Sequence, residues 1–481
     1  MTPTAEPKPH PIYLAGRWVE SPDVVTIANP ARPDLPAGWT YNATAEQYEA
    51  AVTAAVAAFE ATRKLPAYER SEALRKIAEG IAARREEIGR LITAESGKPI
   101  RDALTEVDRG VLTFRIAAEE AERIGGEVIP LDLNPASRGR IGVTSRFPIG
   151  PIAAISPFNF PLNLAAHKLA PAIASGNPIV LKPPSRAPLT MLSVAEAIAE
   201  AGLPEGAVSI MPMTRELGDL MVTDERFKFL TFTGSPAVGW KMKERADKKK
   251  VVLELGGNAG VIVDRSADID WAVRRCVTGA FSYSGQVCIS VQRLFVHEAV
   301  WDDFMGRFVE ATRALRIGDP MDPKTDIGPM IDAAAVERAG RWVDEAVATG
   351  ARVLLGGKAS GTVFPPTILT DVPTEAAICS EEAFAPVVVA RPFNDFAEAV
   401  RGVNEGRFGL QAGVFTSDLA QSWAAFEELE VGGVIINDVP TYRIDHMPYG
   451  GTKDSGQGRE GVRYAIEDMT EIRIMVVASP S

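Results

Sequence analysis

The first part of the chain has the periodicity of amphipathic helices. Between residues 45 and 123, segments such as AEQYEAAVTAAVAAFEA and RSEALRKIAEGIAARREEIGRLI place apolar residues every three or four positions. Ala, Glu and Arg dominate these segments and favour helices. The pattern therefore predicts an α-helical region, which we expect to be scaffold.

Short apolar strands alternate with helical segments from residue 150 to residue 257. The strands PIAAIS, NPIVLKP, AVSIMP, FKFLTFTG and VVLELGG are each followed by polar or glycine-containing turns. Such alternation implies right-handed crossovers and a doubly wound parallel sheet of Rossmann type. Ligands bind beyond the carboxyl ends of the strands in these sheets. The segments SPFNFP, LKPPS, FTGS and ELGG occur at those ends.

The pattern of strands and helices continues in the second half of the chain. Residues 258–438 contain the strand-like runs RLFVHEAV, ARVLLGG, VVVARPF, AGVFTSD and GGVIIND, which predict a second α/β domain. RGRIGVTSRF (residues 138–147) and TEIRIMVV (residues 470–477) resemble exposed strands. Because exposed edges invite pairing with another chain, these two segments are candidates for subunit contacts.

Composition narrows the class of protein. The chain has 481 residues, of which 46% are hydrophobic and 24% charged, so we expect a globular protein of more than one domain. No apolar run of about 18 residues occurs, and the start MTPTAEPKPHP lacks the features of a secretory signal, which favours a soluble cytoplasmic protein without membrane contact. The net charge of −12, with scattered Lys and Arg, argues against a nucleic-acid surface.

Cysteine and histidine are too sparse for a disulfide framework or a metal site. Three cysteines and four histidines lie far apart, so we expect reduced thiols and predict no metal. Cys288, in FSYSGQVCIS, is surrounded by small and polar residues that would leave a nucleophilic thiol accessible. The alternative is a small core residue, which is how we interpret Cys276 and Cys379.

Two polar residues follow strands in positions that suit catalysis. Glu254, in VVLELGGN, would be partly desolvated, which raises a carboxyl pKa and suits a general base; the alternative is a capping or ion-paired residue. Asn159, in SPFNFP, could direct its amide toward a developing oxyanion; the alternative is a turn residue that caps the next helix.

Other residues suit a phosphate or ribose. Lys182, in IVLKPPS, follows a buried strand, although a lysine often extends from such a position without binding anything. Gly234 and Ser235, in FTGSPAVG, open a helix after a strand, where backbone N–H groups and the helix dipole favour a pyrophosphate.

Taken together, the motifs resemble those of the aldehyde dehydrogenase superfamily over nearly the whole chain. The motifs occur in the family's order: PFNFP, KPPS, FTGS, ELGG, GQVC, EEAFAPV and MPYGGTKDSGQGRE. The spacings from Glu254 to Cys288 and from Asn159 to Lys182 also match. Among branches of the family, the chain is most similar to the lactaldehyde, non-phosphorylating glyceraldehyde-3-phosphate and semialdehyde dehydrogenases.

The resemblance implies an α/β, aldehyde dehydrogenase-like fold with three parts. We expect a Rossmann-type parallel-sheet cofactor domain (residues 1–126 and 149–256), an α/β catalytic domain (residues 257–455) and a small β oligomerisation element (residues 127–148 and 470–481). The two strands of that element would join across subunits and make a homodimer or a homotetramer.

The resemblance also assigns a reaction, the oxidation of an aldehyde to a carboxylic acid with NAD or NADP. Cys288 is similar to the nucleophile, and Asn159 with the Cys288 backbone N–H to the oxyanion hole. Glu254 matches the base that activates water to hydrolyse the thioester. Glu471, in MTEIR, is taken as a second carboxylate that relays the proton.

For the cofactor, the resemblance implies contacts to the two riboses, the nicotinamide and the pyrophosphate. The expected contact residues are Ser156, Phe158, Lys182, Ser185, Gly234, Ser235, Leu255, Gly256, Glu382 and Phe384. Ser185 stands where the family often has a glutamate, and a hydroxyl does not repel a 2′-phosphate, so we expect NADP to be accepted. Ala385 replaces a usual glycine, with little expected effect.

For the substrate, the resemblance points to a small, polar and possibly anionic aldehyde. Asn163 and His167 share one helix face that would line the substrate entrance, and Arg443 and Tyr449 would lie close by. The alternative is that His167 and Arg443 make structural hydrogen bonds.

Two other functions compete with this hypothesis. A CoA-acylating semialdehyde dehydrogenase generally lacks the base that Glu254 matches here, and non-catalytic use of the fold predicts a lost nucleophile, whereas Cys288 is present.

Overall fold

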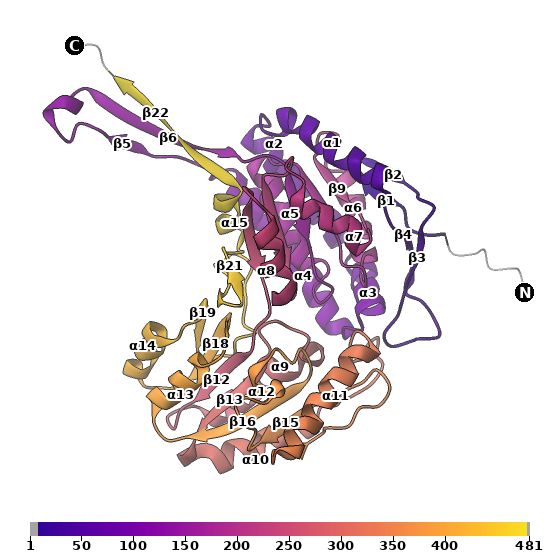
Figure 1. The fold of residues 1–481 in the computed structure, drawn as a ribbon, viewed down its shortest axis with the longest axis vertical. Helices are drawn as coiled ribbons and strands as arrows, with labels where there is room; N and C mark the ends of the chain where they lie inside the picture. The colour runs from indigo at the N-terminus through magenta and orange to yellow at the C-terminus, as the bar shows by residue number, and fades with distance from the viewer. Residues whose placement is uncertain (1–7, 479–481) are drawn as a thin grey trace, which may run out of the picture.

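The computed structural model describes residues 8–478. Two α/β halves lie one above the other, and a narrow β arm projects from the upper half (Figure 1). The first half of the chain builds most of the upper part, and residues from about 259 to 436 build the lower part. The long helices near the N-terminus are α1 (Ala45–Thr62), α2 (Ala67–Ala83), α3 (Arg85–Ser96) and α4 (Ile100–Ala121).

The upper half is centred on an eight-stranded sheet. Its strand order is β2-β1-β9-β8-β7-β10-β11-β21, and the five central strands run parallel. The strands are β1 (Ile12–Leu14), β2 (Arg17–Val19), β7 (Ile152–Ile155), β8 (Ile179–Lys182), β9 (Val208–Ile210), β10 (Phe229–Thr233), β11 (Lys250–Glu254) and β21 (Gly456–Gln457).

Helices cover both faces of this sheet, which explains the unbroken apolar runs of its strands. Along β7, Ile152 and Ala154 pack into one core cluster with α2 and α4, while Ala153 and Ile155 pack into the cluster on the opposite face. The crossover helices are α5 (Asn163–Ser175), α6 (Leu189–Ala199), α7 (Arg215–Thr223) and α8 (Pro236–Arg245). A short hairpin, β3 (Val24–Ile27) and β4 (Gly38–Tyr41), lies near the N-terminus.

The lower half is centred on a seven-stranded sheet of order β14-β15-β16-β13-β12-β18-β19, parallel except for β14. Its strands are β12 (Ala259–Val263), β13 (Val291–His297), β14 (Arg352–Leu355), β15 (Thr367–Thr370), β16 (Val387–Phe393), β18 (Gln411–Phe415) and β19 (Gly433–Ile436). The helices around it are α9 (Ile269–Phe281), α10 (Trp301–Arg313), α11 (Ala333–Ala348), α12 (Ala377–Ser380), α13 (Phe396–Asn404) and α14 (Leu419–Glu428).

The C-terminal part of the chain returns to the upper half. After the two-stranded ladder of β17 (Phe408–Gly409) with β20 (Thr452–Lys453), β21 joins the edge of the first sheet. Helix α15 (Val462–Asp468) then packs against α4 and α5. This return places the MPYGGTKDSGQGRE segment against β17 and against the edge of the first sheet.

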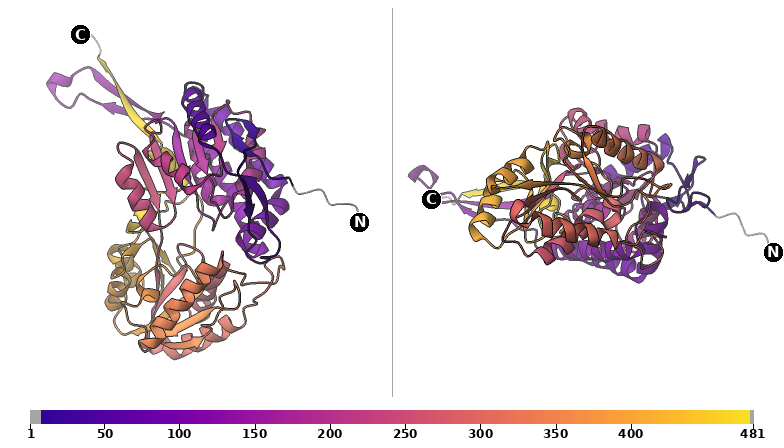
Figure 2. Two further views of the ribbon diagram at one scale, coloured as in Figure 1. Left: turned by 45° about the vertical axis from the view of Figure 1, so that its right-hand side comes forward. Right: turned by 90° about the horizontal axis from the view of Figure 1, so that it is seen from below.

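The arm consists of β5 (Val128–Pro130), β6 (Arg140–Pro148) and β22 (Thr470–Ala478), and it extends away from the body in every view (Figures 1 and 2). Our expectation that β6 and β22 join across subunits is wrong for this pair. They form an antiparallel ladder within one chain, from Thr470 opposite Pro148 to Ala478 opposite Arg140. The outer edge of β22 stays unpaired in the described part of the chain.

The parallel sheet and the second α/β unit that the strand pattern predicts are both present. Within residues 8–478, no helix is long and apolar enough to cross a membrane. The exact domain boundaries remain a prediction.

Candidate active site

A cleft of about 720 Å³ lies beyond the carboxyl ends of β7, β10 and β11 and is closed on its other side by loops of the second half. Ten of the residues expected in the site line it: Phe158, Asn159, Gly234, Ser235, Glu254, Leu255, Gly256, Cys288, Glu382 and Phe384. The parallel topology explains this convergence, because the loops after neighbouring parallel strands emerge at one edge of a sheet.

Cys288 lies between a short 3₁₀ helix, η2 (Ser282–Gly285), and β13, partly exposed at the cleft. Its Sγ is 2.9 Å from the Tyr449 hydroxyl. Burial raises the pKa of the Cys288 thiol to about 12, and the hydrogen bond with Tyr449 opposes this rise. At neutral pH the resting nucleophile is therefore a thiol, which must lose its proton to react.

A left-handed turn aims the cysteine into the cleft. Tyr283, Ser284 and Gly285 have φ values of 49°, 53° and 67°. At the third position only glycine fits, because an added Cβ would lie 2.2 Å from the Ala385 carbonyl oxygen. The Ser284 hydroxyl donates to the Gly328 carbonyl at 2.8 Å and helps to hold the turn. Such consecutive left-handed residues persist only where their surroundings hold them.

Asn159 is buried beside the nucleophile loop. Its Nδ2 donates to the Gln286 carbonyl at 3.1 Å, which leaves the second amide hydrogen available to the cleft. Helix α5 begins at Asn163 after Leu162, which rules out the alternative that Asn159 caps this helix. The amide is therefore held by the carbonyl of Gln286, two positions before Cys288 in the chain, and a fixed amide beside the nucleophile loop suits an oxyanion donor.

Glu254 ends β11, and its carboxylate is buried without a hydrogen-bond partner among residues 8–478. Burial raises the pKa of Glu254 well above its usual value, and the negative charge of Glu460 raises it further. The ion-paired alternative for Glu254 is thus not found. An unpartnered carboxylate on the same cleft as Cys288 suits a general base.

The second carboxylate of the site is Glu460, which the sequence reasoning missed. It accepts from Lys168 at 3.2 Å and from Arg443 at 3.0 Å. Although burial opposes ionisation, Lys168 and Arg443 lower the pKa of Glu460 to about 2. Glu460 closes the MPYGGTKDSGQGRE motif, and its position there is the signal that could have identified it.

Glu471 does not belong to the site, which corrects its assignment as a proton relay. It lies on β22, about half exposed, and pairs with Lys250 at 2.8 Å. Within residues 8–478, this half-exposed carboxylate at the root of the arm has no contact that leads to Glu254.

Lys182 and Ser185 lie at the end of β8, where a ribose or phosphate would be held. Burial lowers the pKa of Lys182 to about 8, and the positive charge of Arg215 adds to this. The Lys182 ammonium is 3.3 Å from the Ser185 hydroxyl, its one hydrogen-bond partner in the described chain. Gly218 leaves room for the Lys182 side chain, because a Cβ atom added at position 218 would lie 2.6 Å from Lys182 Cδ.

The strand-to-helix turn after β10 leads Gly234 and Ser235 into the first turn of α8 at the wall of the cleft. The Gly234 N–H donates to the backbone carbonyl of Glu254 at 3.0 Å, so this hydrogen bond fixes the turn relative to the end of β11. Nearby in the sheet, the buried Ser156 hydroxyl at the end of β7 lacks a partner within residues 8–478. Unpaired polar groups around an open cleft fit a polar ligand such as a dinucleotide.

Glu382 and Phe384 face these groups from the second half. Glu382 accepts from the Gly257 N–H at 3.0 Å, and burial raises the pKa of Glu382 to about 7. Gly256 makes room for it, since an added Cβ would be 2.3 Å from the carboxylate. The rings of Phe384 and Phe158 lie edge to face across the cleft, with their centroids 6.0 Å apart. Glu382, Gly256 and the two rings therefore fit a ribose and a flat nicotinamide ring.

On the far side of Cys288, Asn163 and His167 share one helix face, as predicted, but that face is buried. Both contact Asp445 at 2.9 Å, and Arg109 pairs with the same carboxylate at 2.8 Å. These neighbours lower the pKa of Asp445 against the effect of burial. The contacts of His167 fit the structural alternative stated for it, and Asn163 shares them: both side chains hold the loop of Asp445 rather than line an opening.

Arg443 and Tyr449 lie closer to the sulfur. The Arg443 guanidinium stacks on the Tyr449 ring at 3.7 Å, and the Tyr449 hydroxyl reaches Cys288. The Arg443 side chain is only 6% exposed, yet its Nε has no partner among the described residues. A buried donor without a partner among the described residues therefore lies behind the Tyr449 ring that contacts the nucleophile.

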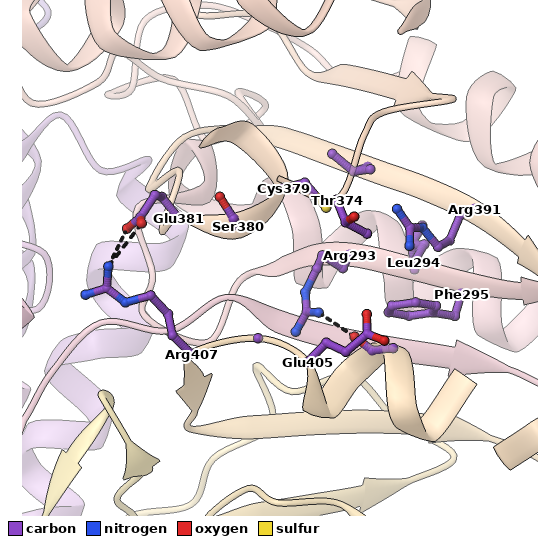
Figure 3. Close-up of a pocket in the computed structure, with 13 residues that line it drawn as sticks. Arg293, Leu294, Phe295, Thr374, Cys379, Ser380, Glu381, Arg391, Glu405 and Arg407 are labelled. Atoms are coloured by element: carbon purple, nitrogen blue, oxygen red, sulfur yellow. Dashed lines mark hydrogen bonds and ion pairs between the residues drawn. The ribbon is translucent and has the colours of Figure 1, made fainter. Parts of the chain in front are cut away.

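A cavity of about 230 Å³ in the second half is lined in part by the loop of Glu381 (Figure 3). Arg407 pairs there with Glu381, and Arg293 donates to the Gly402 carbonyl at 2.8 Å. None of the candidate catalytic residues lines this cavity. Within residues 8–478, no group of three or more His, Cys, Asp or Glu could hold a metal ion.

Comparisons with known proteins agree with this geometry. The profile of the Aldehyde dehydrogenase family matches residues 18–475. The 3-sulfolactaldehyde dehydrogenase of Priestia aryabhattai is 42% identical over 99% of this chain and 100% of that protein. The lactaldehyde dehydrogenase of Methanocaldococcus jannaschii is 39% identical over 97% of this chain and 100% of that protein.

Solved structures agree as well. The crystal structure of aldehyde dehydrogenase 21 from Physcomitrella patens, in complex with the reaction product succinate, has a TM-score of 0.97 and 48% identity, covering 98% of this chain and 99% of that one. Glyceraldehyde-3-phosphate dehydrogenase GapN from Methanocaldococcus jannaschii, complexed with NADP, has a TM-score of 0.91 and 39% identity, covering 95% and 99%. The predicted family and fold class are confirmed: the chain belongs to the aldehyde dehydrogenase family and is an aldehyde-oxidising enzyme that uses NAD or NADP.

Proposed function

We propose that this chain oxidises a small anionic aldehyde to the carboxylic acid through a thioester on Cys288. The Cys288 thiol loses its proton to water, and the resulting thiolate attacks the aldehyde carbon to form a thiohemiacetal, whose oxyanion accepts from the Asn159 amide and the Cys288 backbone N–H. A nicotinamide cofactor held in the cleft would accept a hydride from this adduct, which would leave a thioester. The cofactor contacts proposed are those that line the cleft, together with Ser156, Lys182 and Ser185.

Hydrolysis completes the reaction and restores the thiol. Glu254 takes a proton from water, the water oxygen forms the new bond to the thioester carbon, and the carbon–sulfur bond breaks to release the acid. The raised pKa of Glu254 suits both receipt and release of this proton. Glu460, held by Lys168, keeps a negative charge near the base and favours its protonated form after transfer.

The observation that supports an anionic substrate is the buried cation beside the sulfur. Arg443 is separated from Cys288 by only the Tyr449 ring, and its Nε donor is unpartnered in the described chain. An aldehyde of about four carbons could place a carboxylate, sulfonate or phosphate at this guanidinium while its carbonyl meets the sulfur. The relatives named for sulfolactaldehyde and glyceraldehyde 3-phosphate, and aldehyde dehydrogenase 21 in its complex with succinate, each concern a compound with such an anionic group.

The test compares succinate semialdehyde with butanal, a neutral aldehyde of equal length, and adds lactaldehyde, glyceraldehyde 3-phosphate and 3-sulfolactaldehyde. A charge-assisted hydrogen bond of about 1.5–3 kcal/mol predicts a kcat/KM preference of roughly 10- to 150-fold for the anionic substrate. Arg443→Met should remove most of that preference. Equal kcat/KM values for long aliphatic and short anionic aldehydes would overturn the proposal.

The CoA-acylating alternative predicts that CoA, rather than water, takes the acyl group. Glu254 on the same cleft as Cys288 favours water. Formation of acyl-CoA, measured with CoA in the assay, would instead support the alternative. Non-catalytic use of the fold predicts no cofactor reduction at all.

The arm supports a proposed homodimer or homotetramer. β22 leaves an unpaired edge, and its side chains from Ile472 to Val477 include five that are half exposed or more. A strand this apolar at a free edge favours pairing with a second copy. Sedimentation as a monomer at micromolar concentration would contradict this. The proposed cytoplasmic location is tested by cell fractionation.

A further inference from the structure

A fully buried ion pair lies beneath the two loops that carry Asn159 and Cys288. Lys98, between α3 and α4, contacts the carboxylate of Glu106 on α4, and the two side chains are 1% and 0% exposed. The attraction between two buried charges barely offsets their desolvation, so such a pair adds little net stability. Its contribution therefore lies in what it holds in place.

The carboxylate end of the pair holds the oxyanion loop. Glu106 Oε1 accepts from the backbone N–H of Leu162 at 2.9 Å and of Asn163 at 3.2 Å. These N–H groups open helix α5, directly after the loop of Asn159. Because the first N–H groups of a helix lack partners within it, the carboxylate fixes where the loop ends and the helix begins.

The ammonium end contacts both loops at once. Lys98 Nζ lies 3.7 Å from the centroid of the Phe160 ring and 4.6 Å from that of the Tyr283 ring. Phe160 follows Asn159 in the chain, and Tyr283 begins the left-handed turn that leads to Cys288. Cation–π attraction strengthens when the cation is desolvated, as it is here. One cation therefore joins an aromatic ring from each catalytic loop.

The strained turn gives an independent reason for this contact. Tyr283 has φ 49° and ψ 39°, a conformation that a bulky residue keeps only when its surroundings impose it. Its hydroxyl donates to the Ser96 carbonyl at 3.0 Å, two residues before Lys98. The segment from Ser96 to Lys98 thus holds Tyr283 by its hydroxyl and by its ring face.

We propose that Lys98 is a positioning residue, whose ammonium, held by Glu106 between Phe160 and Tyr283, sets the separation of the Asn159 amide from the Cys288 sulfur. The inference rests on the proposed roles of Asn159 and Cys288. Lys98 touches neither substrate nor cofactor, and it acts through the two rings. An error of about 1 Å in such a geometry lowers a rate roughly 100-fold.

The first test is the double variant Lys98→Met, Glu106→Gln, which removes both charges and keeps an acceptor for the α5 N–H groups. We expect kcat to fall about 10- to 100-fold, with cofactor binding within about twofold and the rate of Cys288 alkylation by iodoacetamide within about threefold of wild type. A merely structural pair would lower thermal stability without this selective loss of kcat.

The matched control is Glu95→Gln. Glu95 is equally buried, and its carboxylate accepts from the N–H groups of Leu189 at 2.9 Å and Thr190 at 3.0 Å at the start of α6, rather than from the helix that follows the Asn159 loop. Its variant should lose stability but keep kcat within about twofold. An equal fall in kcat in the control and in the double variant would overturn the proposal.

A second pair of variants keeps the test decisive if the double variant does not fold. Tyr283→Phe keeps the ring against Lys98, and Tyr283→Leu removes it, at the same backbone strain. We expect kcat within about threefold of wild type for the first and a fall of about tenfold or more for the second. Equal kcat in these two variants, or a folded double variant within threefold of wild type, would overturn the role of Lys98. An inactive wild-type chain would overturn the proposed function as well.

Discussion

The residue three positions after Lys182 offers a direct way to change cofactor preference. In the wild-type chain the Ser185 hydroxyl is 3.3 Å from the Lys182 ammonium, and Arg215 adds positive charge nearby. Ser185→Glu would place a carboxylate about 4 Å from an anion held by this lysine. Two unit charges at about 4 Å repel by roughly 1 kcal/mol in water and roughly 4 kcal/mol at an effective dielectric constant of about 20.

The cleft is open to solvent, so an intermediate value of about 2–3 kcal/mol is reasonable for a phosphate of charge about −2. This corresponds to a rise of roughly 30- to 150-fold in KM for NADP. KM for NAD, which has no 2′-phosphate, should stay within about threefold. The assay is the absorbance of reduced cofactor at about 340 nm with one good aldehyde, over a range of each cofactor and at two salt concentrations.

Ser185→Gln separates charge from size, because glutamine has the shape of glutamate without its charge. We expect the KM of Ser185→Gln for NADP to stay within about fivefold of wild type. Added salt should reduce the rise in KM for NADP in Ser185→Glu but should not change the KM of Ser185→Gln relative to wild type. The reasoning is refuted if Ser185→Glu binds NADP as wild type does, if both variants lose NADP equally, or if the wild-type chain strongly prefers NAD.

Three further predictions follow from the pKa shifts and contacts of the site. Glu254→Gln should lower steady-state kcat by about 10²- to 10⁴-fold. One equivalent of reduced cofactor per site should still form rapidly, as a burst in stopped-flow absorbance. Loss of this burst would mean that Glu254 is needed before the thioester forms. Glu460→Gln removes a charge that raises the pKa of Glu254, so the acidic limb of the kcat–pH profile should shift to lower pH, whereas Glu471→Gln should leave it in place. Tyr449→Phe removes a hydrogen bond that lowers the pKa of Cys288, so alkylation at fixed pH should slow about 2- to 10-fold; an unchanged rate would show that the contact is not formed in solution.

The strands and the cleft were predictable because their signals are local. Each of the five parallel strands of the first sheet is a largely apolar run that ends at, or is closely followed by, a glycine, a proline or a polar residue. Parallel topology then brings Asn159, Lys182, Gly234 and Glu254 to one edge, since each lies at or soon after the carboxyl end of a different parallel strand. Cys288 joins them from the second half, as its motif in the family's order indicated.

The errors concern partners that are remote in sequence. Glu460 and Glu471 are both glutamates near the C-terminus, and only tertiary contact distinguishes them: Glu460 meets Lys168, 292 positions away, whereas Glu471 meets Lys250. Helical spacing correctly put Asn163 and His167 on one face, but their partner, Asp445, is on a distant loop.

The arm shows the same limit. An exposed, β-branched segment can pair with its own chain or with another, and sequence alone does not choose between them. Here β6 pairs with β22 of the same chain, so the outer edge of β22 is the edge available to a second copy.

The most direct test of covalent oxidation through Cys288 is cofactor reduction by purified wild-type protein and Cys288→Ala, with a panel of small aldehydes and with each cofactor. We predict reduction by the wild type, fastest with the anionic aldehydes, and none by the variant, although it should still bind cofactor. Undiminished reduction by Cys288→Ala, or no reduction by the wild type with any aldehyde, would contradict the account.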